Sequence, residues 1–162
     1  KPDEFAKKEV PASVKSQILE AARLTQSGNN TQHWRFILVQ DPANLKTLAK
    51  DSKWGKWVEN ADFAIIVLTD PQFGYHLIDA GRVVQDMELT AWGSGVASCV
   101  FTGLDEEAYR RDFNIPKNLT PSIVVGFGYP AKKLLGKKNR KPLSELVFLE
   151  RYGSKFSPDK LS

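Results

Sequence analysis

"ADFAIIVLTD", residues 61–70, is the stretch that decides the fold. Residues 63–68 are all apolar, with no polar side chain alternating between them. A strand with one face in water alternates apolar and polar residues, whereas a strand covered on both faces is a continuous apolar run. The stretch therefore predicts a central strand with other elements packed on both of its faces.

Helical and strand patterns are interspersed on both sides of this strand. Apolar residues at helical spacing, proline at a first helical position and Asp41 and Asp105 as caps mark the helices. The expected helices cover residues 11–24, 41–50, 75–92 and 105–115, and the other strands residues 34–40, 95–102 and 121–130. Because the connections are short, we expect a single α+β domain over residues 1–162.

The composition fits one globular domain of 162 residues, 41% of them hydrophobic and 26% charged. Cys99 is the only cysteine, which excludes a disulfide within the chain and favours a reducing compartment. Its apolar surroundings predict a buried, inert thiol. No apolar run approaches the roughly 20 residues that span a bilayer, and the opening "KPDEFAKKE" is too polar for a secretory signal. We expect a cytoplasmic protein with no membrane partner.

A net charge of +4 could attract nucleic acid or a phosphate-bearing cofactor, or it could contribute to solubility alone. "SKWGKW", residues 52–57, interleaves aromatic and basic residues, as single-stranded nucleic-acid binders do. A surface helix that buries its Trp edges is the commoner reason for such a pattern, and no second feature supports RNA or DNA. We therefore expect no nucleic-acid partner.

The usual catalytic patterns are absent from the sequence. His33 and His76 are the only histidines, so a zinc site would lack ligands. "GSGVAS", residues 93–98, has no preceding strand, third glycine or Walker lysine, and it predicts a helix-terminating glycine at Gly93 or Gly95. There is no Gly-x-Ser-x-Gly elbow. We expect no metal and no catalytic side chain.

Short polar side chains are concentrated in "TQSGNNTQHWRF", residues 25–36. They can donate and accept hydrogen bonds, which suits recognition of a polar heterocycle or a sugar. The same residues also suit an ordinary capped turn. The loop alone leaves both interpretations open.

Four stretches of the sequence match, in the same order, the motifs of one known protein family. They are "SGNNTQHW" (27–34), "DAGRVVQDMELTAWGSGVAS" (79–98), "VFTGLDEE" (100–107) and "GKKNRKPLSELVFLERYG" (136–153). Taken together they resemble the FMN-dependent nitroreductase family, which includes oxygen-insensitive NAD(P)H nitroreductases and flavin reductases. The resemblance covers almost the whole chain.

Each stretch is similar to one motif of that family. Ser27, Asn30, Gln32 and Trp34 fall on a Ser-x-x-Asn-x-Gln-Pro-Trp signature, with His33 in place of the proline. The second stretch is similar to the long central helix, with Asp79, Gly81 and Gln85 at its Asp-x-Gly and Gln positions. The third resembles a turn whose backbone amides face the flavin N5, and the fourth a Lys/Arg-x-Pro-Leu tail. The family's Arg-rich, phosphate-binding segment would end at about Lys1.

The resemblance implies a nitroreductase-like α+β fold, with a mixed, largely antiparallel sheet flanked by helices, in a domain-intertwined homodimer with two FMN sites at the interface. Residues 142–162 would be an arm that wraps the partner. The implied FMN ligands are Ser27, Asn30, Gln32, Thr102, Gly103, Lys138 and Arg140. Each has a plainer alternative, since the polar side chains could satisfy loop amides, Gly103 could be a turn residue and the two cations could be solvated. Arg140 is the better phosphate ligand, because a guanidinium binds two oxygens at once.

The implied activity is transfer of a hydride from NADH or NADPH, through flavin N5, to a nitroaromatic, quinone or related acceptor by a ping-pong mechanism. The flavin would carry the redox chemistry, which accounts for the lack of catalytic side chains. Two alternatives stay open. One is another FMN enzyme on this fold, such as a reductive dehalogenase or a flavin-fragmenting oxygenase, and the other is a non-enzymatic flavin or nucleic-acid binder.

Overall fold

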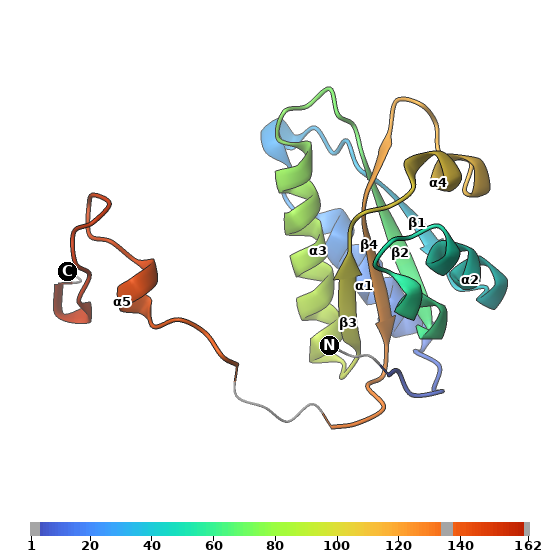
Figure 1. The fold of residues 1–162 in the computed structure, drawn as a ribbon, viewed down its shortest axis with the longest axis horizontal. Coiled ribbons are helices and arrows are strands. Elements are labelled where there is room, and N and C mark those ends of the chain that lie inside the picture. The colour runs from blue at the N-terminus through green and yellow to red at the C-terminus, as the bar shows by residue number, and fades with distance from the viewer. Residues whose placement is uncertain (1–3, 134–137, 161–162) are drawn as a thin grey trace.

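A computed structural model describes residues 4–133 and 138–160. Its sheet has the strand order β1-β2-β4-β3 (Figure 1), and every neighbouring pair is antiparallel. The strands are β1 (Arg35–Val39), β2 (Phe63–Thr69), β3 (Ala97–Phe101) and β4 (Thr120–Gly128). The expected central strand is β2, which pairs with β1 on one side and β4 on the other.

Strand β2 is buried along its whole length. Phe63, Ile65 and Val67 contribute to one hydrophobic cluster, and Ala64, Ile66 and Leu68 contribute to another. Successive side chains of a strand point to opposite faces, so each cluster belongs to one face of the sheet. The continuous apolar run is therefore confirmed as a strand covered on both faces.

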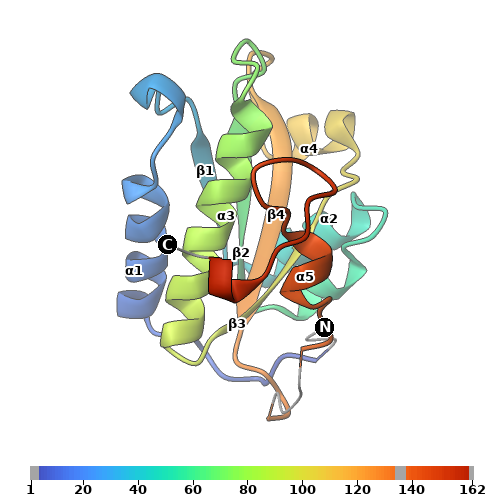
Figure 2. The ribbon, with the colours of Figure 1, turned by 90° about the vertical axis from the view of Figure 1, so that its left-hand side faces the viewer.

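Helices cover both faces of the sheet (Figures 1 and 2). The pair α1 and α3 lies on one face, and α2, a 3₁₀ turn (η2) and α4 lie on the other. The helices are α1 (Ala12–Leu24), α2 (Pro42–Lys50), α3 (His76–Gly93), α4 (Glu106–Asp112) and α5 (Leu143–Leu146), with 3₁₀ turns η1 (Gly28–Asn30), η2 (Lys56–Asn60) and η3 (Pro158–Lys160).

Local signals at the helix ends behave as expected. The Asp41 carboxylate accepts hydrogen bonds from the N–H groups of Ala43 and Asn44, and the Asp105 carboxylate accepts one from Ala108 N–H. Gly95, with φ of +73°, lies just after α3, and its N–H donates to the Trp92 carbonyl. These contacts satisfy backbone groups that a helix end leaves without partners.

Two expectations about single side chains were wrong. Cys99, on strand β3, is only partly buried. The segment "SKWGKW" does not bury both tryptophans, because Trp57 packs edge-on against Phe101 whereas Trp54 is 67% exposed. Trp57 lies within η2, whereas Trp54 lies before its start.

The C-terminal segment from α5 onward lies apart from the sheet and its helices (Figure 1). Contacts within this segment hold it together: the ring centroids of Phe148 and Tyr152 lie 4.4 Å apart, and Leu149 N–H donates to the Ser154 carbonyl. Residues 134–137, which include the start of the family-like stretch 136–153, lie outside the described residues. In the part of the chain that is described, no helix has the length and apolar character needed to cross a membrane.

Candidate functional site

The polar loop and the glycine turn lie at the same end of the sheet. Residues 27–32 lead into the start of β1, and Thr102 and Gly103 follow the end of β3. All three neighbouring pairs in the order β1-β2-β4-β3 are antiparallel, so the start of β1, the end of β2, the start of β4 and the end of β3 lie at the same end of the sheet (Figure 1). They are on opposite edges of the sheet, with β2 and β4 between them, and three strand spacings amount to about 14 Å.

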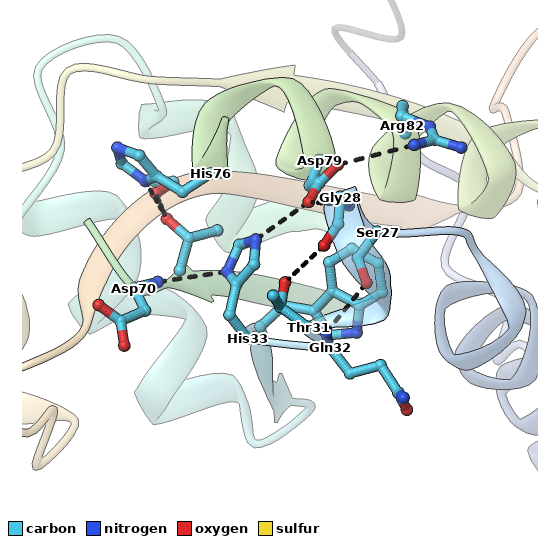
Figure 3. Close-up of polar contacts among 12 residues, drawn as sticks. Ser27, Gly28, Thr31, Gln32, His33, Asp70, His76, Asp79 and Arg82 are labelled. Carbon is cyan, nitrogen blue, oxygen red and sulfur yellow. Dashed lines mark hydrogen bonds and ion pairs between the residues drawn. The ribbon is translucent and has the colours of Figure 1, made fainter. Parts of the chain in front are cut away.

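Ser27, Asn30 and Gln32 contact one another. Gln32 N–H donates to Ser27 Oγ at 2.9 Å (Figure 3). Gln32 Nε2 donates to Asn30 Oδ1 at 3.2 Å. The Asn30 and Gln32 side chains are exposed, so the loop presents amide groups to the solvent. The structure thus brings the three loop residues together, as one cluster of donors and acceptors.

The loop backbone is strained. Asn29, Asn30 and Gln32 have φ values of 50°, 55° and 47°, in the left-handed region that residues other than glycine rarely adopt. Each such residue costs on the order of 1 kcal/mol or more, and the conformation persists only where its surroundings hold it. The loop is therefore anchored by other parts of the chain.

The anchors come from helix α3 and from the end of β2. Asp79 Oδ2 accepts a hydrogen bond from Gly28 N–H at 2.9 Å and lies 3.2 Å from His33 Nε2 (Figure 3). Both side chains are buried. In the sequence, Asp79 and His33 lie on family-like motifs that give them no role, since no local pattern indicates a contact across this sequence distance.

Thr102 and Gly103 form the second group. Gly103 has φ of +78°, and its carbonyl accepts a hydrogen bond from Lys53 N–H at 3.2 Å. Within the described residues, the N–H groups of Thr102 and Gly103 donate no hydrogen bond, and both residues are exposed. The turn thus offers two backbone donors to a bound molecule.

An aromatic side chain stands beside this turn. A Cβ on Gly103 would lie 3.0 Å from Trp54 Cδ1, so the exposed indole covers one side of the turn. An open cavity of about 500 Å³ adjoins the turn and is lined in part by Lys53, Gly103 and Asp105. Another cavity, of about 650 Å³, lies between α1 and α3 beside Gln26 and Arg82. A larger one, of about 1000 Å³, is at the opposite end of the sheet, near Lys8 and Asp62.

Lys138 and Arg140 lie in the segment that leads to α5. Both are exposed, and Arg140 Nη1 donates to the neighbouring Asn139 carbonyl at 2.9 Å. In the described part of the chain, no hydrogen bond or ion pair joins them to the loop or to the turn. The seven residues therefore form three separate groups in one chain: the loop, the turn and the basic segment.

The described residues contain no cluster of three or more His, Cys, Asp or Glu side chains that could hold a metal ion. Acidic groups do meet beneath the turn, where Asp51 is 7% exposed and its Oδ2 makes no hydrogen bond in the described part of the chain. Burial, and next the adjacent Asp112 carboxyl, raise the pKa of Asp51 above its usual range. A hydrogen bond from Arg111 lowers the pKa of Asp112. Asp51 also supports the turn, since its carbonyl accepts a hydrogen bond from Asp105 N–H at 3.1 Å.

Asp51→Asn should stabilise the folded chain at pH 7 by about 1 kcal/mol, because it removes the cost of a buried carboxylate with an unsatisfied oxygen. The direction of this change in stability follows from the raised pKa of Asp51. A folded chain that holds this proton more tightly than the unfolded chain loses stability as pH rises through the folded-state pKa. Urea unfolding should therefore show a small difference at pH 4 and a larger one at pH 7. Asp112→Asn is the control, and it should not stabilise at pH 7; equal stabilities of wild type and Asp51→Asn at both pH values would contradict the prediction.

Comparisons with known proteins agree with the motifs and with the fold. The model of the Nitroreductase family matches residues 4–72 and 50–129. A protein of Methanothermobacter thermautotrophicus, provisionally named NADH dehydrogenase/NAD(P)H nitroreductase, is 31% identical over 79% of this chain and 71% of its own length. One of Archaeoglobus fulgidus, with the same provisional name, is 34% identical over 70% of this chain and 71% of its own length.

The fold is shared with solved structures as well. An FMN-dependent nitroreductase from Clostridium difficile R20291 has a TM-score of 0.86 at 20% identity, covering 93% of this chain and 94% of its own. The family match spans both the polar loop and the glycine turn. The chain belongs to the nitroreductase family.

Proposed function

We propose that this protein is an NAD(P)H-dependent flavin oxidoreductase that uses FMN to reduce nitroaromatics, quinones or related electron-poor acceptors. The proposal rests on the polar loop and on the turn whose two N–H groups donate no hydrogen bond within the described residues. Both lie at one end of the sheet, in a chain of the nitroreductase family. Family relatives provisionally named NAD(P)H nitroreductases support the choice of electron donor.

The residues present fit FMN chemically. Its isoalloxazine ring and ribityl chain carry donors and acceptors that match the hydroxyl and amides of Ser27, Asn30 and Gln32. The exposed N–H groups at Thr102 and Gly103 suit an electron-rich ring atom. The phosphate calls for cations, which Lys138 and Arg140 supply. These seven residues are the proposed cofactor ligands.

When bound, FMN supplies the two-electron redox chemistry. The chain's part is to bind the cofactor, to orient it and to leave one face open, where the nicotinamide donor and the acceptor are bound in turn in a ping-pong cycle. Oriented N–H donors act without rearrangement during the reaction, since the fold fixes them beforehand. No side chain has to exchange a proton for this task.

We further propose a homodimer, with residues 142–162 as an arm that wraps the partner. Helix α3 bears large apolar side chains that are exposed in a single chain, Leu77, Ile78, Leu89 and Trp92. Ile78, Leu89 and Trp92 lie on one stripe of the helix, and Gly81 within that stripe allows close approach. The arm exposes Leu143 and Leu146. Apolar surfaces of this kind mark contact sites, and a partner subunit would bury them.

The experiment combines stoichiometry and turnover. Purified protein should bind about one FMN per chain in a fluorescence titration and sediment as a dimer at micromolar concentration. It should then oxidise NADH or NADPH in the presence of a nitroarene or quinone. The absence of saturable FMN binding would contradict the proposed cofactor. Sedimentation as a monomer with FMN bound would contradict the proposed dimer. A yellow dimer that does not oxidise NAD(P)H would point to another FMN enzyme.

Arg140→Ala should weaken FMN binding by about 1.5–3 kcal/mol, since a charged hydrogen bond to the phosphate would be lost. This is about a 10- to 150-fold rise in Kd. Riboflavin lacks the phosphate and should bind wild type and variant alike. Lys141→Ala is a matched control, because Lys141 is the next exposed cation in the same segment. An equal loss for FMN and riboflavin would remove Arg140 from the phosphate site.

A further inference from the structure

We propose that Asp79 and His33 are positioning residues, which clamp the loop 27–32 in the conformation that presents its polar side chains to FMN. The inference rests on the proposed function for the identity of the ligand. The clamp itself is a set of contacts within the chain. It joins three elements that are far apart in sequence: the loop, helix α3 and the end of β2 (Figure 3).

Asp79 is the centre of the clamp. The residue is 2% exposed and projects from the first turn of α3 toward the loop (Figure 3). Its Oδ2 atom accepts from Gly28 N–H at 2.9 Å and from His33 at 3.2 Å, and its Oδ1 atom lies 3.7 Å from Arg82 Nη1. A buried carboxylate is costly unless such partners compensate it, so these contacts depend on one another.

His33 connects Asp79 to the sheet. Its Nδ1 atom lies 3.4 Å from Asp70 N–H, which can only donate, so Nδ1 must accept. The proton of the neutral ring is then on Nε2, which donates to Asp79. The ring is held in place by Trp34, Phe73 and Tyr75, whose centroids lie 5.3–6.2 Å from it. His33 therefore spans from the end of β2 to α3 in a single tautomer.

Gly28 explains how the loop backbone comes within reach of Asp79. A Cβ at this position would lie 2.5 Å from Tyr75 Cε2, so a larger residue would push the loop off the ring. Thr31 Oγ1 then donates to the Gly28 carbonyl at 3.0 Å. The left-handed residues Asn29 and Asn30 lie between these two anchored positions.

The clamp also accounts for the departure from the resembled signature at position 33. A proline there would restrict the backbone covalently. In this chain, two hydrogen bonds of a buried imidazole hold the same position. The orientation of Asn30 and Gln32 thus depends on side chains that make no contact with the proposed ligand.

The test compares variants that break the clamp with variants that keep it. His33→Leu removes both hydrogen bonds at similar volume, Asp79→Asn keeps the shape and removes the charge, and His33→Gln keeps one donor toward Asp79. The matched control is Asp86→Asn. Asp86 lies two turns further along α3 and accepts from Thr25 Oγ1 at 2.7 Å, a contact that does not involve the strained loop.

Two readouts are needed: the FMN Kd from fluorescence titration, and hydrogen exchange of the Gly28 and Gln32 amides in protein without FMN. His33→Leu and Asp79→Asn should raise the Kd about tenfold or more and speed the exchange of both amides. His33→Gln should stay within about threefold of wild type. Asp86→Asn should leave the Kd unchanged even where it lowers the melting temperature.

The outcomes separate this inference from the proposed function. Unchanged amide exchange in Asp79→Asn and His33→Leu would overturn the clamp. Faster exchange with an unchanged Kd would overturn the positioning role. A rise in Kd for Asp86→Asn equal to that for Asp79→Asn would mean general destabilisation and would also overturn it. If wild type binds no FMN, the proposed function fails, whereas amide exchange still decides whether the clamp exists.

Discussion

Thr102→Pro should slow the reduction of the FMN-loaded protein by NAD(P)H about 10²- to 10³-fold, the range typical of losing one oriented donor. Proline removes the N–H of residue 102, replaces its side chain and restrains its φ to about −65°. The substitution is compatible with the fold, because that N–H donates no hydrogen bond within the described residues. The preceding Phe101 is at the end of a strand, in the extended conformation that a residue before proline prefers.

The matched variant is Thr102→Ala, which removes the side chain and keeps the N–H. It should retain most of the wild-type rate, since the exposed Thr102 side chain makes no hydrogen bond in the described part of the chain. Stopped-flow reduction measures both variants, after FMN occupancy and dimer content have been shown to match wild type. If the proline variant is reduced at the wild-type rate, the N–H of residue 102 does not contribute to flavin reduction.

Phe63→Ala should cost about 3–5 kcal/mol of unfolding free energy, as expected for a large aromatic side chain deleted from a packed core. Phe63 and Phe127 are fully buried, face each other on the paired strands β2 and β4, and stack with centroids 4.8 Å apart. The loss is a large part of the 5–15 kcal/mol that stabilises a typical domain.

Urea unfolding at one fixed protein concentration measures this effect, because the stability of a dimer depends on concentration. Phe63→Leu is the control, since a swap that keeps an apolar side chain of nearly the same size should cost less than about 1.5 kcal/mol. A loss below about 1 kcal/mol for Phe63→Ala would mean that the site collapses around the deletion. It would contradict the close packing that we infer between β2 and β4.

The elements that could be predicted from the sequence are those whose cause is local. The apolar run 63–68 predicts the doubly covered strand, because burial on both faces leaves no position for a polar residue. Asp41 and Asp105 predict helix starts, because a cap bonds residues two or three positions further along. The mutual contacts of Ser27, Asn30 and Gln32 span at most five positions, so the loop was recognisable as a unit.

The supports of the candidate site could not be predicted in this way. Gly28 and Asp79 are 51 positions apart, and His33 and Asp70 are 37 apart, so their contacts exist only after α3 and β2 have packed beside the loop. The burial of Asp51 has a similar origin, since it depends on α4 packing over the end of α2. The sequence shows that these side chains are polar, but it does not show which of them become buried.

The backbone donors at Thr102 and Gly103 have a consequence for how this protein tolerates change. A peptide N–H is the same whichever side chain its residue carries, so alanine at residue 102 would keep the donor and give no signal in an alanine scan. Alanine at Gly103 would also keep the N–H, and any effect would report the φ of +78° and the close approach to Trp54 instead. Substitutions of residue 102 among related chains would likewise leave the N–H donor in place, unless the new residue is proline. The part of the protein that we expect to matter most for electron transfer is therefore the part that a catalogue of side-chain substitutions is least able to detect.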